Sequence, residues 1–122
     1  MIKKFFILLV LFPLALAGCS LQSKPAETVD TLAGKTILYY GSSCPHCKIV
    51  EQYMDDNKVA EKMTIEQKEV YGNQANAKEM AAVASRCGLS TNKIGVPFLW
   101  VENKCLVGDV DINNYFKTKL KL

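Results

Sequence analysis

The sequence predicts one α/β domain, in which a central four-stranded mixed sheet is flanked by three helices in the order β-α-β-α-β-β-α. Short apolar runs rich in β-prone residues alternate with segments of helical periodicity along the chain. A helix links the first two strands, which favours a parallel pair, and the last two strands form a hairpin. A chain of 122 residues suits a single modest core.

The first strand is expected at residues 36–41, because "TILYYG" is a continuous apolar run that suits a strand covered on both faces. The apolar residues after it recur at helical spacing and predict the first helix: Ile49, Val50, Tyr53 and Met54. Pro45 suits the first helical position, because its missing N–H would have no partner there. Cys44 then falls at or near the N-cap.

The second strand is expected within residues 63–71, which are half polar and alternate weakly, as an edge strand does. Residues 73–88 predict the second helix, with Gly88 as its C-cap. Its apolar stripe comprises Ala77, Met80, Ala81, Ala84 and Cys87.

Residues 96–108 predict a β-hairpin, with "ENK" between its two strands. The closing helix follows, with Asp109 or Asp111 expected as its N-cap. One face of that helix carries Ile112, Tyr115, Phe116 and Leu120.

The first 18 residues predict an export signal rather than a part of the domain. Lys3 and Lys4 precede an apolar stretch over residues 5–17. That stretch is shorter than the roughly 20 residues that span a bilayer as a helix, and Pro13 interrupts it. The export signal is therefore favoured over a transmembrane helix.

The end of this segment, "LAGC", resembles the lipobox of bacterial lipoproteins. The resemblance implies that Cys19 becomes the first residue of the mature chain and carries fatty acyl groups such as palmitate. Ordinary cleavage that leaves Cys19 as a free thiol is the alternative. Two or more acyl chains anchor a protein stably to a membrane.

We therefore expect a signal peptide over residues 1–18, a lipidated Cys19 with a polar tether over residues 19–34, and a domain over residues 35–122. The expected location is the periplasmic face of a bacterial cell envelope, and Ser20 favours the outer over the inner membrane. Removal of the signal lowers the formal net charge from +3 to +1, which leaves no strong field for nucleic acid. We also expect a monomer.

The "CPHC" sequence places Cys44 and Cys47 at the expected helix N-terminus. A free cysteine with a pKa of about 8.5 supplies little thiolate at neutral pH, and a helix N-terminus favours the negative charge. We therefore assign Cys44 as the attacking thiol and Cys47, which we expect to be more covered, as the resolving thiol in thiol–disulfide exchange.

His46 and Pro45 lie between these cysteines and are candidates for tuning the thiolate. His46 is the only histidine, and it adds a positive charge or an N–H donor beside Cys44. Stabilising the thiolate favours the dithiol state and makes the disulfide a stronger oxidant. A solvated His46 without a tuning role is the alternative.

Over about residues 35–121, the chain resembles the thioredoxin fold in its short glutaredoxin-like form. The resemblance rests on the first strand, the CxxC at a helix start, Val96-Pro97 before a hairpin and the closing helix. The resemblance implies that Val96 and Pro97 form a cis-proline segment that faces the CxxC and pairs with substrate backbone; a trans proline opening an edge strand is the alternative. Leu38 stands six residues before Cys44, where thioredoxins bury an aspartate.

The "CPHC" tetrad is also similar to that of the DsbA-type periplasmic oxidases, which implies an oxidising protein. Its substrates would be exported proteins that carry thiols or disulfides, and an unidentified redox partner would recycle it. The redox-active Cys44–Cys47 disulfide would serve without a metal or another cofactor. A tethered thiol reductase would use the same residues.

Cys87 and Cys105 could form a second, structural disulfide, or each could be a buried small apolar side chain. Two further functions stay open. The CxxC and His46 could belong to a zinc or Cu(I) binding module. Alternatively, the CxxC disulfide could be purely structural in a tethered binding domain.

Overall fold

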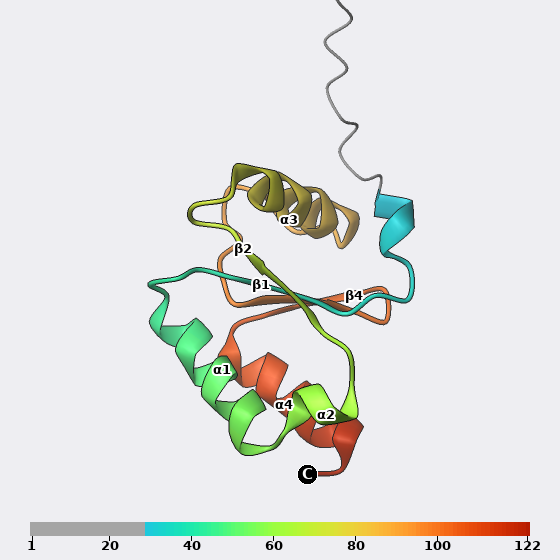
Figure 1. Cartoon of the computed structure of the whole chain (residues 1–122). Helices are drawn as coiled ribbons and strands as arrows, with labels where there is room; N and C mark the ends of the chain where they lie inside the picture. The colour runs from blue at the N-terminus through green and yellow to red at the C-terminus, as the bar shows by residue number, and fades with distance from the viewer. Residues whose placement is uncertain (1–28) are drawn as a thin grey trace, which may run out of the picture.

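The computed structural model describes residues 29–122, which form a three-layered domain with a mixed sheet in the middle (Figure 1). The strand order is β2-β1-β3-β4, with β1 parallel to β2 and antiparallel to β3. This thioredoxin-like arrangement confirms the predicted fold class. The strands are β1 (Ile37–Tyr40), β2 (Glu66–Glu69), β3 (Phe98–Val101) and β4 (Lys104–Val107).

Helices cover both faces of the sheet (Figure 1). On one face lie α1, α2 and α4, and on the other lie α3 and the 3₁₀ helix η1. The three longer helices match the prediction, whereas α2 and η1 were not predicted because four residues are too few to show a helical period. Their bounds are η1 (Val29–Leu32), α1 (Pro45–Asp56), α2 (Val59–Lys62), α3 (Gln74–Arg86) and α4 (Asp109–Leu120).

The core between the sheet and helices α1, α2 and α4 fixes the position of α1. Val50 of α1 and Phe116 of α4 are fully buried against Leu99 of β3. Full burial of each such apolar side chain contributes about 1.5–3 kcal/mol relative to exposure. The helix that follows the CxxC is therefore anchored by its apolar face, and its N-terminal end stays at the edge of this core.

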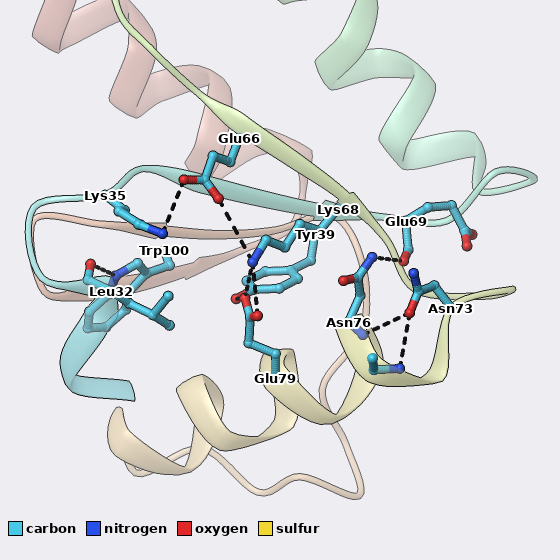
Figure 2. A network of polar contacts seen from close by, with 11 residues as sticks. Leu32, Lys35, Tyr39, Glu66, Lys68, Glu69, Asn73, Asn76, Glu79 and Trp100 are labelled. Atoms are coloured by element: carbon cyan, nitrogen blue, oxygen red, sulfur yellow. Dashed lines mark hydrogen bonds and ion pairs between the residues drawn. The ribbon is translucent and has the colours of Figure 1, made fainter. Parts of the chain in front are cut away.

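The core on the α3 side of the sheet includes residues that precede the predicted domain boundary at residue 35. Leu32 of η1 is fully buried together with Tyr39 and Trp100. The Trp100 Nε1–H donates to the Leu32 carbonyl oxygen at 3.1 Å (Figure 2). Part of the segment that was predicted as a polar tether is thus packed into the fold.

A polar network borders this second core where β2 meets α3 (Figure 2). The Tyr39 hydroxyl donates to Glu79 Oε1 at 2.6 Å, and Lys68 Nζ donates to both Glu79 oxygens at 2.7 and 2.9 Å. Burial raises the pKa of Tyr39 far above its ordinary value, and the bond to Glu79 adds to this. Tyr39 therefore stays protonated and serves as a donor that ties β1 to α3.

Helix α3 has a side-chain cap at its start and a left-handed glycine after its end. Asn73 caps α3 by accepting the N–H groups of Ala75 and Asn76 (Figure 2). At the other end of α3 the C-cap is Cys87 rather than the predicted Gly88. Gly88 follows it directly and has a φ of 72°, a left-handed conformation that glycine adopts without strain. Helix α4 differs from the prediction.

The N-cap of α4 is Gly108 rather than Asp109 or Asp111. Both aspartates lie inside the first turn of the helix, and Gly108 makes no side-chain cap bond. Their carboxylates are still favourable there, because the N-terminal N–H groups of a helix attract negative charge. The expected capping role was wrong, and one of these carboxylates has a different partner, described below.

The β3–β4 hairpin is confirmed, with Val101 paired to Lys104 across a two-residue turn. Within residues 29–122, none of the helices has the length and the apolar character needed to cross a membrane.

Candidate active site at the start of α1

The chain leaves the sheet at the end of β1 and turns directly into α1. The Cys44 N–H donates to the Gly41 carbonyl oxygen at 3.1 Å, which closes the turn. Cys44 is the N-cap of α1 and Pro45 its first residue, as the sequence predicts. The Cys47 N–H donates to Cys44 Sγ at 3.1 Å, so a sulfur takes the place that an oxygen usually occupies in a helix cap.

Cys44 and Cys47 are joined by a disulfide whose Cα atoms lie 5.2 Å apart. Only 4% of Cys44 and 5% of Cys47 is exposed. In the disulfide form the two cysteines are therefore equally covered, and the expected greater burial of Cys47 is not seen. After reduction, the N-cap position of Cys44 places a thiolate against helix N–H groups, which stabilise it.

The Val96-Pro97 segment faces the CxxC, and its peptide bond is cis. Cys44 Sγ lies 3.5 Å from the Val96 carbonyl oxygen, so a reduced Cys44 thiol is within reach of donating to it. The Gly108 N–H donates to the Pro97 carbonyl oxygen at 2.9 Å. This bond brings the start of α4 to the same end of the domain as the CxxC.

The loop before Cys44 is fastened by the Glu69 carboxylate at the end of β2. Glu69 Oε1 accepts the N–H groups of Ser42 at 3.2 Å and Tyr71 at 2.8 Å, and Oε2 accepts that of Gly72 at 2.8 Å. These bonds, above all the one from Gly72, lower the pKa of Glu69. One carboxylate thus joins the loops that follow β1 and β2.

Tyr71 lies over the beginning of the same loop. A Cβ atom built on Gly41 would collide with the Tyr71 ring, so the ring occupies space that any side chain at residue 41 would need. Tyr71 is nonetheless 58% exposed. The ring therefore covers the backbone beside the CxxC while its other side faces solvent.

A small hollow of about 60 Å³ adjoins Cys47 on the α1 side of the sheet. Leu38 lines this hollow and is almost fully buried, so an apolar side chain stands beside Cys47 at that place. The remaining lining residues are Tyr40, Gly41, Lys48, Glu51 and Gln67.

The His46 side chain contacts the start of α4. Its Nδ1 lies 2.9 Å from Asp109 Oδ1. The His46 side chain is 68% exposed and that of Asp109 is 19% exposed. The sequence prediction singled out His46, but it considered Asp109 only as a possible helix cap.

The remaining predicted cysteines lie elsewhere. Cys87 and Cys105 are bonded to each other, with Cα atoms 6.2 Å apart, and pack against the core beneath α3. Cys19, the predicted lipidation site, lies outside the described residues. Within residues 29–122, His, Cys, Asp and Glu side chains form no group of three or more that could hold a metal ion.

Two residues of this site, Glu69 and Asp109, were missed by sequence reasoning. Glu69 lies 27 positions from Ser42, and Asp109 lies 63 positions from His46. Neither spacing follows a local period or a known motif. Only the fold brings these side chains to the CxxC.

Comparison with protein-family models gives no match to this chain, and comparison with curated proteins gives none either. The chemistry of the site is therefore judged from its geometry. A CxxC at a helix N-terminus, on a thioredoxin-like fold, is suited to thiol–disulfide exchange, because the helix end stabilises the thiolate that forms when the disulfide opens.

Proposed function

We propose that this chain is an exported, membrane-tethered thiol–disulfide oxidoreductase that introduces disulfides into exported proteins. The observation that carries the proposal is the position of Cys44 as the N-cap of α1, with its Sγ accepting the Cys47 N–H. Each helix N–H directed at Sγ stabilises a thiolate more than a thiol. The dithiol form is favoured accordingly, and the disulfide becomes a better oxidant.

In the proposed reaction, a substrate thiolate attacks Cys44 Sγ and breaks the Cys44–Cys47 bond. Cys47 leaves as a thiolate, and the substrate is joined to Cys44 in a mixed disulfide. A second substrate thiolate then attacks the substrate sulfur of that mixed disulfide and releases Cys44 as a thiolate. Two electrons pass from the substrate to the cysteine pair, and an unidentified redox partner removes them.

The tethering part of the proposal rests on the sequence. The apolar segment and the "LAGC" lipobox support lipidation at Cys19 and a place at the periplasmic face, with the outer membrane favoured. Mass spectrometry of the chain from bacterial membranes tests this point: we expect a mature N-terminus at Cys19 with the mass of its acyl chains. An unmodified Cys19 would contradict it.

The test of the redox function is the equilibrium reduction potential of the Cys44–Cys47 pair. The full chain is equilibrated in glutathione buffers and its free thiols are alkylated. Mass spectrometry of the peptide that contains Cys44 and Cys47 then gives the fraction of reduced protein. A potential near or above about −150 mV supports the oxidant, whereas one near or below about −270 mV indicates a tethered reductase. A pair that resists reduction altogether would mean that the disulfide is structural.

The same sample addresses the metal-binding alternative. Protein purified with reduced thiols is analysed for bound zinc and copper. We expect less than stoichiometric metal, because the two cysteines and His46 would have to recruit another ligand to complete a tetrahedral site. Stoichiometric metal would favour the binding module over the oxidoreductase.

A further inference from the structure

The contact between His46 and Asp109 joins the two helix ends that meet at the CxxC. His46 is the second residue of α1 and Asp109 the first of α4. The 2.9 Å distance between Nδ1 and Oδ1 corresponds to a hydrogen bond in which the imidazole N–H donates to the carboxylate. The pair lies beside the redox-active disulfide, because His46 immediately precedes Cys47 in the chain.

Asp109 is the fixed member of this pair. Its helix is anchored by Ile112 and Phe116, which are fully buried, and the preceding Gly108 N–H is bonded to the Pro97 carbonyl oxygen. The carboxylate also lies in the first turn of α4, where the helix N–H groups favour its charge. The more exposed His46 ring is therefore held where Asp109 places it.

This arrangement limits how much His46 can stabilise the Cys44 thiolate. The Nδ1–H is already donated to a carboxylate, so it is not available to a sulfur. The negative charge of Asp109 also offsets any positive charge on the ring. A free histidine at this place would stabilise the thiolate more than the held one does.

We propose that Asp109 is a positioning residue that holds His46 and thereby lowers the oxidising strength of the Cys44–Cys47 disulfide. The inference rests on the proposed redox function, since it concerns the potential of that pair. A less stable thiolate disfavours the dithiol and makes the disulfide a weaker oxidant. Asp109 thus sets the potential below the value that the "CPHC" tetrad alone would give.

The test compares the reduction potentials of the full chain and its Asp109→Asn variant in the same glutathione buffers. Asparagine keeps the size of the side chain but removes its charge and weakens its hold on the imidazole. Because the pair is partly exposed, we expect the equilibrium to shift about threefold to tenfold toward the dithiol, and tenfold corresponds to about 30 mV for a two-electron couple.

Asp111→Asn is the matched control. It removes the same charge from the same turn of α4, yet Asp111 makes no bond to His46. We expect it to shift the equilibrium by less than about twofold, since a screened charge on the surface has little effect. Far-UV circular dichroism and thermal unfolding of each variant show that the fold is kept.

A double-mutant cycle tests whether Asp109 acts through His46. In a His46→Gln background, Asp109→Asn should shift the equilibrium by less than about twofold, because the group that it positions is gone. An equal shift in both backgrounds would mean that Asp109 acts on the thiolate directly. Such a result would overturn the inference, as would no shift, or a shift toward the disulfide, in the otherwise unchanged chain.

These outcomes are separate from a failure of the proposed function. If the Cys44–Cys47 pair cannot be reduced at all, the redox function itself is wrong. If the pair titrates normally and Asp109→Asn changes nothing, only the role of Asp109 is wrong.

Discussion

The Glu69 carboxylate accepts the Ser42 N–H at 3.2 Å, and this bond ties the end of β2 to the loop that leads into Cys44. The same carboxylate accepts the Tyr71 and Gly72 N–H groups. Three backbone donors in two loops therefore depend on one charged side chain. Its ionisation should be visible in the stability of the domain.

Glu69→Gln should destabilise the domain at neutral pH and have a smaller effect in acid. The pKa of Glu69 is lower in the folded state than its ordinary value of 4.5, so the stabilisation is present above that value and is lost as the pH falls through the folded pKa. Urea unfolding at neutral pH and near pH 3 measures both differences.

Glu61→Gln, on α2, is the control, because the Glu61 carboxylate accepts none of these three bonds. It should leave the unfolding midpoint nearly unchanged at either pH. The interpretation of Glu69 would be wrong if both variants behaved alike.

Leu32→Ala should lower the free energy of unfolding by about 2–5 kcal/mol, the usual cost of emptying a fully buried leucine site. Fluorescence of Trp100, the only tryptophan, reports the unfolding directly, because its indole is bonded to the Leu32 carbonyl. Leu122→Ala, at a residue 36% exposed, serves as the comparison. Equal costs at the two positions would contradict the packing of η1.

Gly41→Ala should displace the Tyr71 ring rather than unfold the domain. The added Cβ collides with the outer part of a ring that can rotate into solvent, so we expect a cost of about 0.5–1.5 kcal/mol. In a Tyr71→Ala background the same change should cost almost nothing. Urea unfolding of the four proteins measures the coupling, and additive costs would argue against the contact.

Replacing both Cys87 and Cys105 by alanine should cost about 2–4 kcal/mol, because their disulfide closes a loop with a sequence separation of 18 residues. This bridge lies on the α3 side of the sheet, so the reduction potential of the Cys44–Cys47 pair should not change. Unfolding and glutathione titration of the same variant test the two statements. A large change in potential would mean that the two disulfides are coupled.

Cys47→Ser should accumulate mixed disulfides with substrate proteins. Its Cys44 thiolate still attacks a disulfide of a substrate and displaces one substrate thiolate, but the Cys47 thiol that would attack Cys44 Sγ and reopen the bond is missing. Cys44→Ser should abolish turnover and trap no partner through residue 44. Non-reducing electrophoresis of each variant from cells distinguishes them. If Cys44→Ser were the variant that trapped partners, the assignment of attacking and resolving thiols would be reversed.

Much of the fold follows from local signals in the sequence. The apolar run before Gly41 predicted β1, and Pro45 placed the start of α1 correctly because a proline fits the first helical position without losing a bond. The polar alternation of β2 indicated an edge strand, which the sheet order confirms. Each of these signals spans fewer than ten residues.

The features that were missed depend on contacts over long distances in the chain. Leu32 lies in a mostly polar segment with too few apolar residues to show a period, so nothing marks it as a core residue, although Trp100 and the rest of the core cover it. Asp109 looked like a helix cap because the cap preference of aspartate is strong, but Gly108 takes that position. Its actual partner, His46, could be identified only once the two helix ends were in place.

The edge strand β2 has a consequence for how copies of this domain behave when they are crowded. Its residues are Glu66, Gln67, Lys68 and Glu69, all polar, and the charged ones are held in contacts within the domain. Another chain that added to this edge would have to strip water from these charges or break those contacts. The β2 edge of the sheet is therefore protected against strand-by-strand aggregation.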